Sequence, residues 1–248
     1  MKNLLIYVNP QGFDLESEKL AKIQIENSLE IGWKPNDIIL VTNFPYEYMS
    51  VKAKEIEGGY CDFQKEASKI TTLVHLFDKG LIDEKQLYWL HDLDAYQLEE
   101  IKQEELGIDD YDAGFCDYTR ISRIQMGTFF FWKRSEDIFR AIVDKMTASN
   151  EYGAIVNDED AINKMIQNNE NDISKRIKIL DGRYDFGMRR IDYCYQKITK
   201  PIKILHFHPY HPRNGVNNLK SAMHGINSIK MPLMNERLIN IFNKHGYT

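Results

Sequence analysis

Two carboxylates separated by one residue, Asp92 and Asp94, follow a short apolar run that begins at Tyr88. Successive side chains of a strand face opposite ways, so both carboxylates reach one cation only if the backbone turns there. We therefore expect the strand to end at Asp92. Ligands of open α/β sheets collect beyond the carboxyl ends of strands. Hard oxygen ligands suit Mg²⁺ or Mn²⁺, so the pair predicts a divalent ion that holds a diphosphate. A polar turn after a core strand is the alternative.

A second candidate group lies at the end of an apolar run at 202–207 and in the residues that follow it. It contains His206, His208, His211 and Arg213. A strand that ends in histidine places an imidazole at a sheet edge, and imidazole is an acceptable Mn²⁺ ligand beside carboxylates. A hydrolase or phosphoesterase that uses the three histidines is the alternative. It would place two or three of them on one zinc ion.

The elements that position these groups follow the order strand, helix, strand, which indicates a parallel sheet. Apolar runs predict strands at 4–8, 37–43, 86–91, 128–132, 177–180 and 202–207. Helical spacing predicts helices at 14–31, 63–81, 98–106, 135–146 and 158–167, and two helical pieces between 219 and 247. Ser135 is the expected N-cap of its helix. Polar composition predicts loops at 50–59 and 109–118.

Composition limits the possible functions. The 248 residues, 43% of them hydrophobic, are enough for one domain with a large core. The net charge of −5 leaves no basic excess for general binding to nucleic acid. The first apolar run is too short for a signal peptide, and none reaches the roughly 20 residues of a membrane span. Cys61, Cys116 and Cys194 lack metal-ligand spacing, so we expect reduced thiols in a cytoplasmic protein.

Taken together, Asp92, Asp94 and His206 resemble the metal site of GT-A fold glycosyltransferases. The resemblance is strongest to the retaining family that includes glycogenin and the bacterial galactosyltransferases of lipooligosaccharide synthesis. It implies an α/β, Rossmann-like single domain with a mostly parallel central sheet flanked by helices. We expect a nucleotide-binding half at 1–95, a half for the donor sugar, the acceptor and the closing metal strand at 96–215, and a helical tail at 216–248.

Three further stretches resemble the same family in the same order, at 125–131, 158–163 and 180–186. The first is similar to an Asn-Ala-Gly segment that lines the donor sugar, with Gln125 in place of Asn. The second is similar to Asp-Gln-Asp-x-Leu-Asn, whose middle residue lies on the reactive face of the sugar. Glu159 takes that place here, flanked by Asp158 and Asp160. The third is similar to the turn Leu-Pro-x-x-Tyr-Asn-Phe.

The resemblance also implies contacts to the nucleotide. The family's base lies over the end of the first strand, where this chain has Tyr7, Val8 and Asn9. A basic residue on the helix before the carboxylate strand often contacts phosphate, and Lys69 takes that place unless it is a solvated helix charge. His211 or Arg213 stands near the family's diphosphate-binding Lys, and Arg would be the better phosphate ligand.

The reaction implied is transfer of a sugar from a nucleotide diphosphate sugar, with UDP favoured, to an acceptor hydroxyl on a glycan. Mn²⁺ or Mg²⁺ would be the cofactor. The resemblance favours retention, whereas an inverting enzyme needs a carboxylate base such as Glu159 or Asp160. Besides the hydrolase, a module that binds sugar nucleotides without turnover is a further alternative. The oligomeric state stays open.

Overall fold

A seven-stranded sheet forms the centre of the protein in a computed structural model that describes residues 1–117, 123–187, 195–209, 218–224 and 232–247. Its strands, in sheet order, are β10 (Ile177–Leu180), β8 (Ala113–Asp117), β9 (Ile124–Phe131), β6 (Tyr88–His91), β1 (Lys2–Ile6), β2 (Ile38–Thr42) and β5 (Lys54–Glu55). Only β9 runs antiparallel to its two neighbours; the other pairs are parallel. The expected mostly parallel α/β sheet is confirmed.

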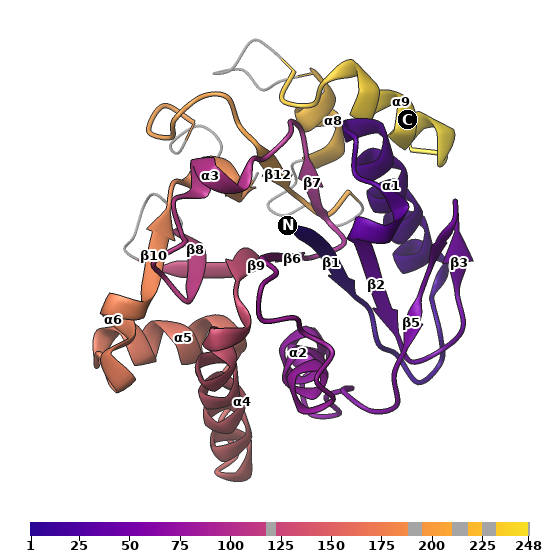
Figure 1. Cartoon of the computed structure of the whole chain (residues 1–248). Coiled ribbons are helices and arrows are strands. Elements are labelled where there is room, and N and C mark those ends of the chain that lie inside the picture. Colours follow the sequence, from indigo (N-terminus) through magenta and orange to yellow (C-terminus); the bar gives the residue numbers. More distant parts are fainter. Residues whose placement is uncertain (118–122, 188–194, 210–217, 225–231, 248) are drawn as a thin grey trace.

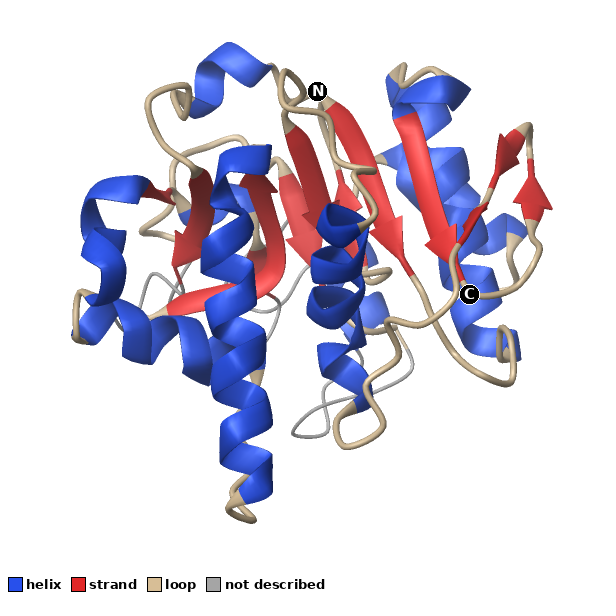
Figure 2. Cartoon of the chain, turned by 60° about the horizontal axis from the view of Figure 1, so that its bottom comes forward, coloured by secondary structure: helices blue, strands red, loops and turns tan. Residues whose placement is uncertain are grey.

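Helices cover both faces of this sheet (Figure 1). One face packs against α2 (Ser68–Asp78), α4 (Glu136–Glu151) and α5 (Asp158–Gln167), and Figure 2 shows α2 and α4 side by side across it. α1 (Leu15–Ile31) packs on the other face, and α9 (Glu236–Lys244) packs against α1. The remaining described helices are α3 (Gln103–Leu106), α6 (Ile173–Arg176) and α8 (Asn218–His224).

Capping residues set the ends of α1, close to the range that the sequence predicts. The Asp14 side chain accepts hydrogen bonds from the backbone N–H groups of Glu16 and Ser17, and Gly32 ends the helix with φ 112°. Ser135 precedes α4, but its hydroxyl donates to the carbonyl of Trp132 at 2.6 Å instead of capping the helix. The expectation that its side chain caps α4 was therefore wrong.

A second, three-stranded sheet contains β11 (Phe186–Gly187), β12 (Ile204–His206) and β7 (Ala95–Gln97). β12 is the strand expected at 202–207, and it lies outside the main sheet. It pairs antiparallel with β7, with His206 opposite Ala95. Since β7 begins directly after Asp94, this pairing brings His206 to the acidic pair.

Two segments expected to be loops contain strands. The segment 50–59 holds β5 and part of the hairpin of β3 (Glu47–Tyr48) and β4 (Val51–Lys52). These strands are two residues long and carry charged side chains, so they lack an apolar pattern. β8 lies within 109–118, where the preceding acidic residues obscured Phe115, which is fully buried.

Two helices also have bounds that differ from those expected from the sequence. The helix expected at 98–106 forms only as α3, because the backbone N–H of Leu98 donates to the carbonyl of Lys203 and extends the pairing of the small sheet. α2 begins at Ser68, after a 3-10 turn, although the helical pattern starts at 63. The two helical pieces expected in the tail are confirmed as α8 and α9.

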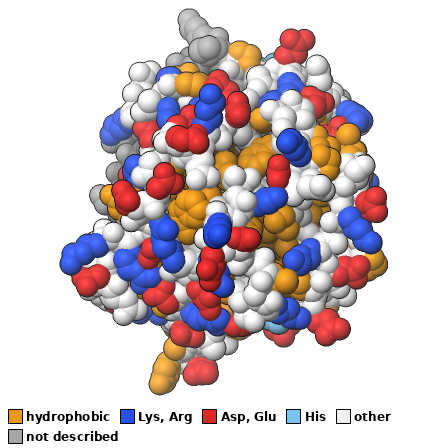
Figure 3. All heavy atoms as spheres, viewed as in Figure 1, with side chains coloured by type: hydrophobic (Ala, Val, Ile, Leu, Met, Phe, Trp, Pro, Cys, Tyr) orange, Lys and Arg blue, Asp and Glu red, His pale blue; other side chains and the backbone are white. Residues whose placement is uncertain are grey.

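Charged side chains of both signs are interspersed over the face shown in Figure 3, in keeping with the small net charge of −5. Among the described helices, none combines the length and the apolar character that crossing a bilayer requires.

Candidate active site

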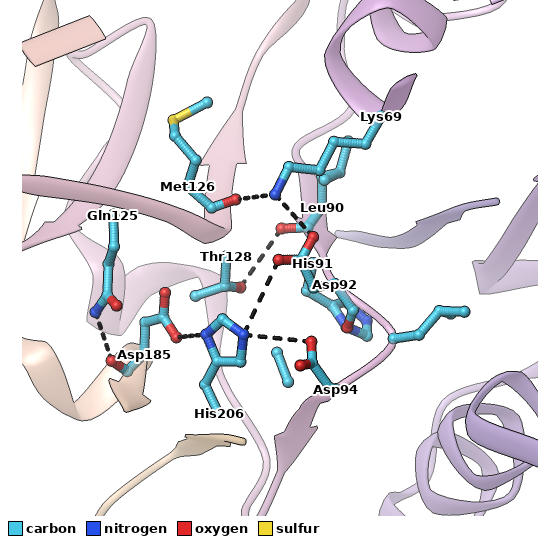
Figure 4. Close-up of polar contacts among 12 residues, drawn as sticks. Lys69, Leu90, His91, Asp92, Asp94, Gln125, Met126, Thr128, Asp185 and His206 are labelled. Carbon is cyan, nitrogen blue, oxygen red and sulfur yellow. Dashed lines mark hydrogen bonds and ion pairs between the residues drawn. The ribbon is translucent and has the colours of Figure 1, made fainter. Parts of the chain in front are cut away.

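The backbone turns at the acidic pair, as expected. β6 ends at His91, and the backbone N–H of Asp92 donates to the carbonyl of Gly127 at 2.8 Å. The N–H of Ala95 then donates back to the carbonyl of Asp92 at 3.1 Å, which closes the turn. The turn allows both carboxylates to face one space (Figure 4).

His206 completes a group of three candidate metal ligands. Its Nε2 atom lies 3.3 Å from Oδ1 of Asp94 and 4.0 Å from Oδ2 of Asp92. One ligand atom from each of these residues lies within 4.8 Å of the other two. Two carboxylates and one imidazole form a donor set that suits Mn²⁺ or Mg²⁺ with room for further oxygen ligands. The residues present therefore fit the implied cation.

Electrostatics at the site also favour a cation. Burial raises the pKa of Asp92 to about 6, and neighbouring Asp94 adds to the rise. Burial opposes ionisation of Asp94 as well, but His206 lowers the pKa of this carboxyl to about 2. Burial disfavours the charged form of His206, yet Asp185 and Asp94 together hold its pKa well above the usual value. These carboxylates thus lie where an added positive charge stabilises them.

Lys69 brings a fixed positive charge to the same place from α2. Its Nζ atom lies 2.7 Å from Oδ1 of Asp92 and 2.5 Å from the carbonyl oxygen of Met126 (Figure 4). A third oxygen, Oδ2 of Asp158, is 3.8 Å away. Burial alone would lower the pKa of Lys69, but Asp92 and Asp158 raise it above the usual value. With 13% of its side chain exposed, Lys69 is not a solvated helix charge.

The acidic start of α5 lies beside this group. Asn157 caps the helix by accepting from the N–H of Asp160 at 2.7 Å. Burial raises the pKa of Asp158. Oδ2 of Asp158 is buried and accepts no hydrogen bond from the described residues. Nη2 of Arg123 lies 2.7 Å from Oδ1 of Asp160 and 3.6 Å from Oε2 of Glu159.

A cavity of about 1300 Å³ connects these groups. Most of the residues expected to bind or react line it: Tyr7, Val8, Asn9, Lys69, Asp92, Asp94, Gln125, Asp158, Glu159 and His206. Arg123, His208 and Asp185 line it as well. The cavity is large enough for a ligand the size of a nucleotide sugar. Asp160 is not among the residues that line the cavity, and its carboxylate accepts a hydrogen bond from Arg123.

The histidine cluster does not assemble around one ion in the described residues. Nε2 of His208 lies 3.4 Å from Oε1 of Glu16, at the start of α1, and His206 is the one histidine of the ligand group. His211 and Arg213 fall outside the described part of the chain, as does Cys194.

Three roles at the site were not foreseen from the sequence. Arg123, a lone basic residue before a strand, contacts Asp160. Gly127 leaves space for the His206 ring, and Asp185, which lies in a turn, contacts that ring. The sequence offered one signal for Asp185, because an acidic residue stands here where the similar family motif has Asn.

Comparisons with known proteins find similarity in structure alone. No protein-family model matches the chain, and no curated protein matches its sequence. Mouse xyloside xylosyltransferase 1, in its apo form, is 12% identical with a TM-score of 0.51, over 86% of this chain and 99% of that one. The chain has the GT-A fold.

Two further solved structures match the whole of this chain. The glycosyltransferase GlyE of Streptococcus pneumoniae TIGR4 is 13% identical with a TM-score of 0.59, covering 100% of this chain and 65% of that one. The galactosyltransferase LgtC, in complex with donor and acceptor sugar analogs, is 10% identical with a TM-score of 0.58, over 100% of this chain and 97% of LgtC. Because one fold hosts many functions, the activity has to be argued from the site.

Proposed function

We propose that this chain is a metal-dependent glycosyltransferase that moves a sugar from a nucleoside diphosphate sugar to a hydroxyl group of a glycan, with UDP-sugars favoured. The observation that carries the proposal is the convergence of Asp92, Asp94 and His206 in one large cavity. The GT-A fold supports it, since the similar solved structures named above are glycosyltransferases.

The three converging residues would hold Mn²⁺ or Mg²⁺. Such an ion, when bound, acts as a Lewis acid that stabilises the negative charge of the departing diphosphate. Lys69 adds a second positive charge beside Asp92. Because two hydrogen bonds already hold its ammonium group, Lys69 would need little reorganisation when a diphosphate arrives.

The end of β1 would hold the nucleotide. Tyr7, Val8 and Asn9 line the cavity there. The backbone N–H of Asn9 donates to Oδ1 of Asn43 at 2.8 Å, and the Tyr7 hydroxyl donates to Oδ2 of Asp14 at 3.0 Å. These bonds fix the shape of this end before a ligand binds. Gln125 would contact the donor sugar.

The acidic start of α5 would face the reacting sugar. As the acceptor oxygen forms its bond to the anomeric carbon, the bond to the phosphate oxygen breaks, and the electron pair leaves with the nucleoside diphosphate. The carboxylates of Glu159 and Asp158 would stabilise positive charge that develops on the sugar, and Asp160 would hold Arg123 beside them. With retention, the hydroxyl proton passes to the departing phosphate; with inversion, Glu159 would take it.

The competing hydrolase is less favoured by the site. A zinc hydrolase gathers two or three histidines on one ion. Among the described residues, the candidate ligand group contains one histidine, His206, and His208 pairs with Glu16. A binding module without turnover is separated from an enzyme by the experiment below.

The test incubates the protein with a panel of nucleotide sugars, Mn²⁺ and candidate glycan acceptors, and measures the nucleoside diphosphate released. We expect release that needs both Mn²⁺ and acceptor and that falls at least 100-fold in Asp94→Ala. Asp110→Asn, an exposed acidic residue away from the cavity, is the matched control and should retain full activity. Donor binding without release would identify a binding module, and release that ignores chelation of the metal would contradict the proposal.

A further inference from the structure

The His206 ring is held from behind by a buried carboxylate. Its Nδ1 atom lies 2.9 Å from Oδ1 of Asp185, while Nε2 faces Asp94 (Figure 4). The Asp185 side chain has 0% exposure, so solvent does not compete for this contact. One ring nitrogen is therefore bound to the protein, and the other is directed at the acidic pair.

Two residues of β9 keep this arrangement in place. A Cβ atom at Gly127 would lie 2.1 Å from Cε1 of His206 and 3.2 Å from Oδ2 of Asp185, so a side chain there would displace the ring. Nε2 of Gln125 donates to the backbone carbonyl of Asp185 at 2.6 Å and ties this segment to the main sheet (Figure 4). The rigid strand thus supports both the imidazole and its partner.

The Asp185 carboxylate is not explained by packing. Its second oxygen, Oδ2, is buried and forms no hydrogen bond with the residues that the structure describes. A buried carboxylate oxygen without a partner is destabilising, and an apolar side chain of similar size would avoid this cost. A buried acid with an unpartnered oxygen, in direct contact with a candidate metal ligand, indicates a role in the site.

We propose that Asp185 is a positioning residue that accepts the Nδ1 hydrogen of His206 and so presents the Nε2 lone pair to the cation at Asp92 and Asp94. This inference rests on the proposed function, since it requires that cation. A carboxylate only accepts hydrogen bonds and therefore favours the ring form with hydrogen on Nδ1. Such outer carboxylates also fix ring orientation and increase the basicity of the ligand nitrogen.

The test measures binding of Mn²⁺ alone to the full chain by calorimetry. We expect Asp185→Ala to weaken binding about 10- to 100-fold. Asp185→Asn keeps the size and an acceptor oxygen, so it should lose less than Asp185→Ala. If the role operates through the ring, adding Asp185→Ala to His206→Ala should weaken binding no further. Asp181→Asn, in the same segment but outside the cavity, is the control.

A second variant protects the test against misfolding. Gly127→Ala leaves Asp185 intact but pushes the ring away, so it should weaken Mn²⁺ binding to a similar degree. Wild-type affinity in Asp185→Ala, with weakened binding in His206→Ala, would overturn the positioning role and leave the proposed metal site standing. Equal binding by His206→Ala and wild type would reject the metal site itself and, with it, this inference.

Discussion

Nζ of Lys69 lies 2.7 Å from Oδ1 of Asp92, although the two residues come from α2 and from the turn after β6. The contact places a permanent positive charge against the carboxylate that is expected to bind a metal. Nearby Asp158 extends the same group. The site therefore presents carboxylates and an ammonium group together, an arrangement that suits a ligand carrying both phosphate and a bound cation.

Lys69→Met should weaken binding of the nucleoside diphosphate. A charge-assisted hydrogen bond to phosphate contributes roughly 1.5–3 kcal/mol, which corresponds to about a 10- to 100-fold loss of affinity. Calorimetric titration with UDP in the presence of Mn²⁺ measures this affinity. Lys79→Met, at the exposed end of the same helix, is the control and should bind normally. Normal affinity in Lys69→Met would remove this residue from the phosphate site.

Glu159→Gln should reduce turnover while leaving nucleotide affinity nearly unchanged. The carboxylate would act on the reacting sugar and its acceptor, and loss of such a group typically costs 10²–10⁴-fold, of which we expect roughly the lower end. Steady-state rates and UDP affinity are measured side by side, with Glu151→Gln on exposed α4 surface as control. A large loss of affinity would show that Glu159 binds the nucleotide instead.

Arg123→Gln should reduce kcat with little change in stability. The guanidinium contacts Asp160 and lies 3.6 Å from Glu159, so its removal takes a positive charge away from both acids. We expect a loss of about tenfold in kcat, and since the pair is partly exposed, less than about 1 kcal/mol in the free energy of unfolding. Arg140→Gln breaks a similarly exposed pair with Asp78 and should leave kcat unchanged. Equal kcat in the two variants would contradict the role.

Unfolding stability should depend on pH through Glu26, a carboxylate of α1 that is 2% exposed. Burial would raise its pKa, but Lys244, the Tyr48 hydroxyl and His245 together lower it. A carboxyl with a lowered folded pKa stabilises the fold above its unfolded pKa, and this contribution disappears as pH falls through the folded value.

Glu26→Gln should therefore cost roughly 1–3 kcal/mol at pH 7 in urea denaturation, and the difference from wild type should shrink below about pH 4. Glu30→Gln, one turn further along α1 and exposed, should cost little at either pH. A difference that persists unchanged in acid would show that the charge of Glu26 does not stabilise the fold.

Apolar runs and helical spacing made much of the fold predictable. The carboxyl end of β6 was recognisable because Asp92 follows an apolar run, and the helix predicted at 14–31 forms as α1. The short edge strand β5 was not, because Lys54 and Glu55 are both exposed. Such strands are specified by backbone pairing, which leaves no periodic signal in the side chains.

Some residues of the candidate site were likewise predictable from the sequence, and others were not. Asp92, Asp94 and His206 have side chains with recognisable metal chemistry, so their types suggested a common role before their positions were known. The roles proposed for Asp185 and Gly127 rest on contacts made only after folding, between segments far apart in the sequence. Neither the burial of the Asp185 side chain nor the lack of space for a side chain at Gly127 can be read from neighbouring residues in the sequence. Both emerged only from the three-dimensional arrangement.

The most direct test is an anomalous difference map from crystals of the wild-type protein grown with UDP and Mn²⁺. The account predicts a manganese peak bonded to Nε2 of His206 and to a carboxylate oxygen of Asp92 or Asp94, next to the diphosphate. A diphosphate bound in this cavity with manganese elsewhere, or with none, would contradict it.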